Sequence, residues 1–156
     1  MSVHIGWESE GDGPPLLLIH GLGYTRDGWG PVPGLLAERF RVIRFDNRGI
    51  GESDVPEGPY TAAEMAADAL QVLDEAGVER AHVVGTSLGG MVAQELALAA
   101  PERVGKLVLA CTTGGGPDAF PLPQREAGAR QTLRYIGDLM GGGSLPLPSA
   151  LRLMVR

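Results

Sequence analysis

One serine of this sequence lies where a hydroxyl group could act as a nucleophile. A short β-branched run at 83–84 is followed directly by Gly-Thr-Ser-Leu-Gly over 85–89, and a small-residue, apolar segment comes next. A strand, a sharp Gly-x-Ser-x-Gly turn and a helix in succession are the requirements of a nucleophile elbow, which holds its serine in a strained backbone conformation. Gly85 and Gly89 leave room where strand and helix approach closely. The pattern predicts that Ser87 is an acyl-transfer nucleophile.

The same turn could also stabilise negative charge. The N–H groups in the first turn of a helix lack partners, and the helix dipole favours an anion there. Acyl transfer needs such preorganised donors for the oxyanion of its tetrahedral intermediate, and the residue after the nucleophile, here Leu88, supplies one of them. A serine hydroxyl is a poor nucleophile at neutral pH until a base, commonly histidine, removes its proton. The turn therefore predicts half of an active site, and the base must lie elsewhere.

The three histidines do not provide an obvious base. His82 lies five residues before Ser87 on a predicted strand, which at about 3.3 Å per residue separates the two by roughly 15 Å. His4 belongs to the first predicted strand, and nothing in the sequence places it near the serine. His20 follows a buried strand and could be a base or a structural residue. No histidine follows Ser87.

Strands and helices alternate along the first two thirds of the chain. An alternating edge strand is predicted over 3–7, a fully buried strand over 16–19, and further strands over 41–45, 81–85 and 104–110. Helices are predicted over 33–40, after Thr61, and over 88–100. Such alternation indicates an α/β fold with a mostly parallel sheet and helices on both faces. We therefore take 1–113 as the core of the fold.

The segment after Thr61 is the clearest helix. Thr61 and Glu64 form a capping box, and Gly77 supplies a C-terminal stop. Between them, one face of the helix is apolar, and we expect it to be buried against the sheet. That face comprises Met65, Ala69, Val72 and Leu73.

The remainder, 114–156, differs from the core. It opens on three glycines and a proline, carries further prolines, and offers one amphipathic helix over 127–140 and a helix start at 150–155. We interpret it as an excursion off the sheet, the start of a helical cap, because no further strand is legible. The strand at 104–110 would then be an exposed apolar edge, which favours self-association.

Composition excludes several classes of function. The 156 residues are 44% hydrophobic and 21% charged, with a net charge of −6 and no basic run, so we expect neither a nucleic-acid nor a membrane partner. One cysteine, Cys111, and no visible signal peptide predict a cytoplasmic protein, and we expect that thiol to be buried and inert. No metal-ligand spacing, Walker loop or dinucleotide fingerprint is present, so no metal and no cofactor are predicted.

Four motifs, taken together, are specific to one family. They are His-Gly-Leu-Gly at 20–23 after a strand, Trp29, the pattern Asp-x-Arg-Gly-x-Gly-x-Ser at 46–53, and Gly-x-Ser-x-Gly-Gly at 85–90. The motifs stand in this order along the chain, and each strand-end motif follows its strand. In this arrangement the chain resembles the α/β-hydrolase fold superfamily, in the group of serine esterases, enol-lactonases and cofactor-free haloperoxidases. The resemblance covers about residues 3 to 113. It implies a serine hydrolase acting on small carboxylic esters or lactones.

The resemblance also implies roles for individual residues. Leu22 supplies the second backbone oxyanion donor, and His20 and Gly21 hold the loop that carries it. Trp29 lines the substrate pocket or simply packs beneath it, and both alternatives stay open. Asp46 and Arg48 fix a turn rather than act on substrate, and the serine at 87 separates this chain from dehalogenase and epoxide-hydrolase relatives with aspartate there.

The family order of serine, acid and histidine is not completed here. Asp118 and Asp138 follow Ser87, but no histidine does, and the last two strands of the family sheet are missing. We therefore predict an incomplete α/β-hydrolase fold, truncated before its acid and histidine, that hydrolyses p-nitrophenyl acetate no faster than a Ser87→Ala variant. The alternative is a non-catalytic ligand-binding or interaction module built on a shortened hydrolase fold.

Overall fold

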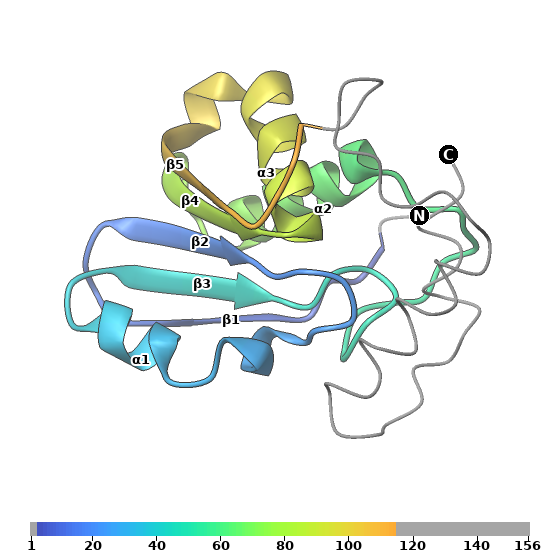
Figure 1. The fold of residues 1–156 in the computed structure, drawn as a ribbon. Helices are drawn as coiled ribbons and strands as arrows, with labels where there is room; N and C mark the ends of the chain where they lie inside the picture. The colour runs from blue at the N-terminus through green and yellow to red at the C-terminus, as the bar shows by residue number, and fades with distance from the viewer. Residues whose placement is uncertain (1–2, 115–156) are drawn as a thin grey trace.

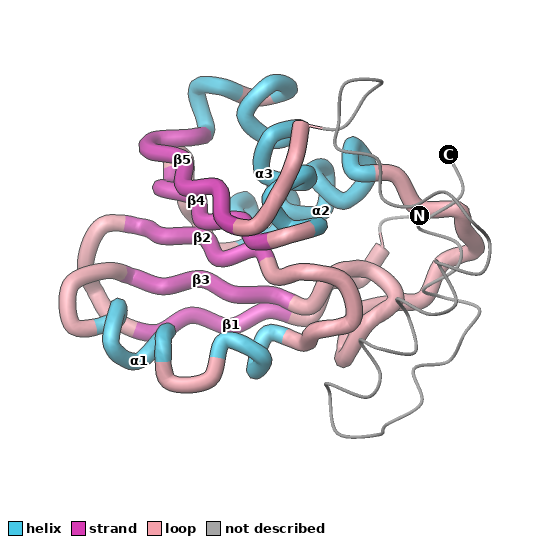
Figure 2. Tube along the Cα trace, in the orientation of Figure 1, coloured by secondary structure: helices cyan, strands magenta, loops and turns pink. Residues whose placement is uncertain are grey.

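A five-stranded sheet forms the centre of the molecule. The computed structural model describes residues 3–114, and its strands are β1 (Trp7–Glu10), β2 (Pro15–Ile19), β3 (Arg41–Phe45), β4 (Ala81–Thr86) and β5 (Val104–Ala110). Their order across the sheet is β1-β3-β2-β4-β5 (Figure 1, Figure 2). Only β1 runs antiparallel to its neighbour, and the other pairs are parallel. The predicted α/β class with a mostly parallel sheet is confirmed.

Helices cover both faces of this sheet. The helices α2 (Ala62–Glu75) and α3 (Leu88–Ala99) pack on one face, and α1 (Val32–Ala37) lies on the other (Figure 1). Two 3₁₀ turns, η1 (Arg26–Trp29) and η2 (Pro101–Arg103), lie in the connections. The helix α1 ends three residues before the predicted boundary, because the N–H groups of Arg39 and Phe40 both donate to the Leu36 carbonyl and close the last turn.

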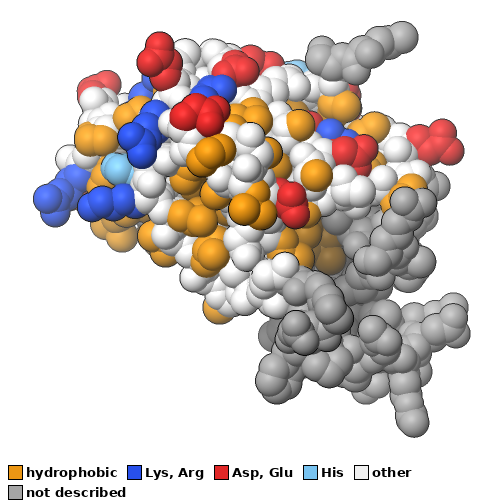
Figure 3. Space-filling view, turned by 90° about the horizontal axis from the view of Figure 1, so that it is seen from above, with side chains coloured by type: hydrophobic (Ala, Val, Ile, Leu, Met, Phe, Trp, Pro, Cys, Tyr) orange, Lys and Arg blue, Asp and Glu red, His pale blue; other side chains and the backbone are white. Residues whose placement is uncertain are grey.

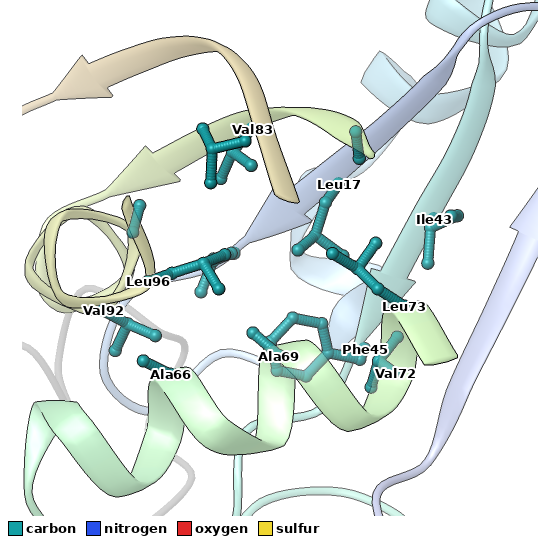
Figure 4. Close-up of a cluster of buried hydrophobic side chains, with 14 of the residues drawn as sticks. Leu17, Ile43, Phe45, Ala66, Ala69, Val72, Leu73, Val83, Val92 and Leu96 are labelled. Carbon is teal, nitrogen blue, oxygen red and sulfur yellow. The ribbon is translucent and has the colours of Figure 1, made fainter. Parts of the chain in front are cut away.

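Two hydrophobic clusters fix the sheet between its helices. The larger cluster joins one face of β2, β3 and β4 to α2 and α3, with the side chains of Leu17, Phe45, Leu73 and Val83 packed together (Figure 4). The smaller cluster lies on the opposite face, where Leu16, Leu18 and Val42 are buried beneath residues of α1 and η1. Successive residues of β2 therefore point to opposite cores, which explains its uninterrupted apolar sequence.

The edge strand at the N-terminus lies later in the sequence than predicted. The predicted strand over 3–7 is wrong: β1 begins at Trp7 and pairs with β3 from there to Glu10. The preceding backbone bonds to a loop instead, since the Gly6 N–H donates to Ser53 Oγ at 2.9 Å and the Gly6 carbonyl accepts from Asp46 N–H at 2.9 Å. Ile5 is consequently fully buried in the larger cluster rather than half-buried on a sheet edge.

The helix α2 follows its predicted signals at both ends. Thr61 Oγ1 accepts from the Glu64 N–H, and the Glu64 carboxylate accepts in return from the Thr61 N–H, which completes the capping box. At the other end Gly77 has a φ of 67°, and the Val78 N–H donates to the Leu73 carbonyl, as in a Schellman motif. All four residues of the predicted apolar face are buried.

The strand β5 forms one edge of the sheet within residues 3–114. Its apolar side chains Leu107, Val108 and Leu109 are exposed, as is Leu98 on α3, in agreement with the predicted apolar edge. Figure 3 shows hydrophobic side chains gathered on this side of the molecule. The prediction of a buried thiol at Cys111 is wrong: the residue is exposed, because it lies just beyond β5 on this open edge and has a φ of 50°.

None of the helices in this part of the chain is both long and apolar enough to cross a membrane. The predicted helices over 127–140 and 150–155 lie outside the described residues, as does all but the first residue of the predicted excursion at 114–156.

Candidate active site

Ser87 occupies a strained turn between β4 and α3. Its φ of 54° and ψ of −119° lie in a region that non-glycine residues rarely adopt, at a cost of about 1 to 3 kcal/mol. Ser87 is also the N-cap of α3, yet its side chain makes no capping hydrogen bond. Its hydroxyl donates to no other described residue and accepts from none. The turn therefore presents a hydroxyl that no structural hydrogen bond occupies.

Two glycines allow the elbow to close. A Cβ on Gly85 would lie 2.8 Å from the Ala93 side chain on α3. A Cβ on Gly89 would lie 2.6 Å from the His20 carbonyl oxygen and still closer to that of Ile19. These contacts show that the first turn of α3 is pressed against β4 and against the end of β2, and that only glycine fits at both positions.

The loop after β2 lies directly against Ser87. A Cβ on Gly21 would stand 3.2 Å from Ser87 Cβ and 3.7 Å from its Oγ. The Gly21 N–H donates to His20 Nδ1 at 2.7 Å, so it is already satisfied. The N–H groups of Leu22 and Leu88, in contrast, donate to no described residue. Two unpaired backbone donors thus belong to the two segments that meet at the serine.

His20 is held as a neutral acceptor. Its ring stacks on Tyr24 with centroids 4.3 Å apart, and Trp29 lies tilted beside it at 4.6 Å. Burial lowers the pKa of the imidazole below its usual 6.5, and a hydrogen bond with the Gly28 backbone counteracts part of that shift. Because Nδ1 accepts from Gly21, the ring is engaged in shaping the loop. Trp29 packs against this ring and against the smaller hydrophobic cluster.

Buried charges anchor the same loop to the end of β3. Asp46 Oδ1 accepts from the Arg26 N–H at 2.7 Å, and its Oδ2 accepts from Arg26 Nη1 at 2.6 Å and from the Glu52 N–H at 3.0 Å. Nearby, Arg48 forms a two-pronged ion pair with buried Asp68 of α2 at 2.6 and 2.8 Å. Asp46 and Arg48 thus hold loops in place.

Three residues at this site were not predicted from the sequence. Arg26 completes the Asp46 network, Asn47 Nδ2 donates to the His20 carbonyl at 3.1 Å, and Thr112 Oγ1 donates to the Ser87 carbonyl at 2.7 Å. Asn47 occupies the first variable position of the 46–53 motif. Only its place at the end of a predicted strand could have indicated that it lies near the site. Arg26 and Thr112 had no signal, because their partners are 20 and 25 residues away in sequence.

The other predicted residues are not brought to the serine. His82 Nδ1 accepts from the Lys106 N–H at 3.0 Å, at the opposite end of β4 from the elbow. His4 is tied to Asp54 through its backbone N–H at 2.8 Å. Asp118 and Asp138 lie outside the described residues. Over residues 3–114, no group of three His, Cys, Asp or Glu side chains is arranged to hold a metal ion.

Comparisons with known proteins identify the family of this chain. The family model described as alpha/beta hydrolase fold matches residues 14–138. A curated relative from Azorhizobium caulinodans, named "Putative carbamate hydrolase RutD", is 48% identical over 103 residues, which are 66% of this chain and 39% of that protein. The chain therefore spans about two fifths of the length of this relative.

Solved structures match over most of the chain. The enol-lactonase from Burkholderia xenovorans LB400 superposes with a TM-score of 0.73 at 29% identity, covering 88% of this chain and 55% of that one. A thermophilic esterase from Thermogutta terrifontis gives a TM-score of 0.71 at 30% identity, covering 90% and 50% respectively. The matched part of this chain spans about half of each of these two proteins.

Proposed function

The chain belongs to the α/β-hydrolase fold family, and from that premise we propose that it carries the nucleophile and the oxyanion donors of a serine hydrolase. In this proposal Ser87 attacks the carbonyl carbon of a small carboxylic ester or lactone. Leu22 and Leu88 donate their backbone N–H groups to the oxyanion. His20, Gly21, Gly85 and Gly89 maintain the geometry of the two segments.

One observation carries the proposal: a serine whose hydroxyl is unused lies where two segments meet, and each segment has an unpaired backbone N–H group. The first N–H groups of a helix have no intrahelical partner, so the Leu88 N–H is available to an oxyanion, and the Leu22 N–H in the adjoining loop has no described partner either. Loss of a single oxyanion donor typically costs about 3 kcal/mol of transition-state stabilisation. A serine that served only to cap a helix would use its oxygen for that purpose, and Ser87 does not.

The proposed reaction has two steps, acylation of Ser87 and hydrolysis of the acyl-serine. The Ser87 oxygen bonds to the acyl carbon while its proton passes to a base, and the ester C–O bond breaks to release an alcohol that regains that proton. Water then attacks the acyl-serine in the same way, which releases the acid and restores the hydroxyl. In a lactone the alcohol and the acid are two ends of one product.

The substrate class is argued from the relatives. Their names include an enol-lactonase and an esterase, both of which act on an acyl–oxygen bond, and a carbamate hydrolase, which acts on a related carbonyl. These activities belong to proteins about two to two and a half times as long as the stretch matched here. For this chain, an ester or lactone is therefore proposed as the class, with the acyl–oxygen bond as its common feature.

None of the three histidines is assigned as the base. His20 Nδ1 accepts from the Gly21 N–H, His82 lies at the far end of β4, and no contact among the described residues brings the His4 imidazole to Ser87. Because the base is the missing part, an experiment can supply it as free imidazole in solution. Ser87 should then react with an activated ester, p-nitrophenyl acetate, to form an acetyl-serine.

Mass spectrometry of tryptic peptides measures this product directly. Cleavage after Arg80 and Arg103 yields a peptide that contains Ser87 and no lysine, so acetyl groups on amines do not interfere. Ser9, an exposed serine of β1, reports the reactivity of an ordinary hydroxyl in the same sample. We expect Ser87 to be acetylated about a hundredfold faster than Ser9, in line with the effect of oxyanion donors.

The Ser87→Ala variant is the matched control, and its peptide should carry no acetyl group. Acetylation of Ser87 at the rate of Ser9 would contradict the proposed function. It would instead support the alternative of a ligand-binding or interaction module that retains the hydrolase fold without its chemistry.

A further inference from the structure

Thr112 joins the end of β5 to the nucleophile turn. Its Oγ1 donates to the Ser87 carbonyl at 2.7 Å, and two residues earlier the Ala110 carbonyl accepts from the Ser87 N–H at 2.9 Å. One short segment therefore bonds to both backbone polar groups of Ser87, whose carbonyl also accepts from the N–H groups of Gly90 at 3.0 Å and Met91 at 3.4 Å in the first turn of α3. Because Ser87 has a strained backbone, such external bonds are what hold it in that conformation.

The carbonyl that Thr112 contacts belongs to the same peptide unit as the Leu88 N–H. A peptide unit is planar, so fixing the direction of its C=O also fixes the direction of its N–H. A donor on the carbonyl oxygen further polarises the unit and strengthens the N–H as a donor, because hydrogen bonds in a chain reinforce one another. The Thr112 hydroxyl thus acts on the proposed oxyanion donor from the opposite end of its peptide group.

Two residues of α3 determine the position of Thr112. A Cβ on Gly90 would lie 2.5 Å from Thr112 Cβ and 2.6 Å from its Oγ1, so only glycine leaves room for the threonine. Gln94 Nε2 donates to the carbonyls of Gly90 and Thr113, both at 3.0 Å, and ties the segment after β5 to the helix. The hydroxyl of Thr112 is therefore held against the elbow from two sides.

We infer that Thr112 is a positioning residue for the oxyanion hole, which it serves by orienting and polarising the Ser87–Leu88 peptide group. This inference rests on the proposed function for its catalytic meaning. The Thr112 hydroxyl would then contribute to acyl transfer although it does not belong to the triad of serine, acid and histidine. A side chain that only filled space at this position would need the shape of threonine but not its hydroxyl.

Two variants separate shape from hydrogen bonding. Thr112→Val retains the branched shape and removes the donor, whereas Thr112→Ser retains the donor and removes a methyl group. With imidazole as the base, we expect Thr112→Val to acetylate Ser87 about three- to tenfold more slowly, the equivalent of one lost hydrogen bond. The p-nitrophenyl acetate concentration giving half-maximal rate should not change, and Thr112→Ser should stay within about twofold of the parent.

A spectroscopic measurement tests the contact without using activity. In an HNCO spectrum of the 156-residue chain, one cross-peak correlates the Leu88 amide with the Ser87 carbonyl carbon. Loss of the donor in Thr112→Val should move both the carbonyl carbon and the amide proton upfield, and Thr112→Ser should leave them near their original positions. Urea unfolding of the three proteins checks that their stabilities are comparable.

The outcomes distinguish this inference from the proposed function. An unmoved Leu88 cross-peak in Thr112→Val, or a rate equal to that of the parent, overturns the role of Thr112. A shifted cross-peak in a protein whose Ser87 is no more reactive than Ser9 overturns the proposed function, and supports only the hydrogen bond. Slower acetylation in Thr112→Val with recovery in Thr112→Ser supports both.

Discussion

Within residues 3–114, two long helices each begin at a residue with a hydroxyl group, and they use that group in opposite ways. At α2, Thr61 has an extended backbone with a φ of −107°, and its side chain caps the helix. At α3, Ser87 has a φ of 54°, and its side chain caps nothing. The helix α2 is therefore secured by its own sequence, whereas the start of α3 is secured by its neighbours.

Contacts with these neighbours stabilise a backbone conformation that the residues of the turn do not favour by themselves. The Ala110 carbonyl and the Thr112 hydroxyl bind the Ser87 backbone, and the first turn of α3 is wedged against the end of β2 at Gly89. A residue that violates local preference persists only where its surroundings over-determine it, and such residues cluster at functional sites. The contrast between the two helix starts thus supports the active site proposed at the elbow.

The largest expected difference between the two starts is steric. Gly89 and Ala63 are the second residues of α3 and α2, respectively. Gly89→Ala would drive a methyl group into the Ile19 and His20 carbonyls, so we expect a loss of about 3 kcal/mol in the free energy of unfolding. The exposed Ala63→Gly change should cost only about 1 kcal/mol, the ordinary helix preference for alanine. Urea denaturation of both variants measures the two values.

Gly34 of α1 provides a control for the alanine substitution itself. A Cβ there meets nothing within 4 Å, so Gly34→Ala should leave stability unchanged or raise it by up to about 1 kcal/mol. If Gly89→Ala were as well tolerated as Gly34→Ala, the first turn of α3 would not be wedged against β2, and the comparison would fail.

A smaller difference is expected when the two hydroxyls are removed. Thr61→Ala deletes an N-cap acceptor and should destabilise the protein by about 1 kcal/mol. Ser87→Ala deletes a hydroxyl with no described partner and should change stability by no more than about 0.5 kcal/mol. Thermal unfolding of the two variants side by side checks the pair. Equal losses would show that the Ser87 hydroxyl has a structural role that the contacts do not reveal.

The start of α2 could be predicted from the sequence more fully than the start of α3. The capping box, the C-terminal glycine and the buried face of α2 were all predicted, because each depends on residues within a few positions of one another. The Gly-x-Ser-x-Gly turn was predicted for the same reason. The bonds that hold that turn were not, since Thr112 and Ser87 are 25 residues apart and no local pattern connects them.

Two errors have a similar cause. The edge strand was placed over 3–7 because its residues alternate, but tertiary bonds from Gly6 to the loop at 46–53 take the place of a sheet partner there. Cys111 was predicted to be buried from its residue type, but the edge position of β5 leaves it exposed. In both positions the deciding factor was which segments lie side by side in space.

The smallest expected difference between the two regions is in their response to acid. Near the elbow, burial lowers the pKa of His20 below 6.5, so the unfolded chain binds its proton more readily than the folded protein. Stability due to His20 is therefore complete above pH 6.5 and is lost as the pH falls from there toward the folded pKa. At α2, hydrogen bonds from Thr61 lower the pKa of Glu64 below 4.5. Its contribution is complete above pH 4.5 and is lost only as the pH falls through the folded pKa.

The free energy of unfolding, measured from pH 8 to pH 3, should consequently fall in two separate steps. The first step comes from protonation of His20 in the loop beside Ser87, and the second from protonation of Glu64 at the start of α2. His20→Asn keeps an acceptor for the Gly21 N–H and removes the titration, so it should abolish the loss just below pH 6.5 and leave the acidic one. Glu64→Gln keeps a capping-box side chain and should do the reverse. A loss just below pH 6.5 that survives His20→Asn would mean that another group titrates there, and that the neutral imidazole is not what holds the loop against the serine.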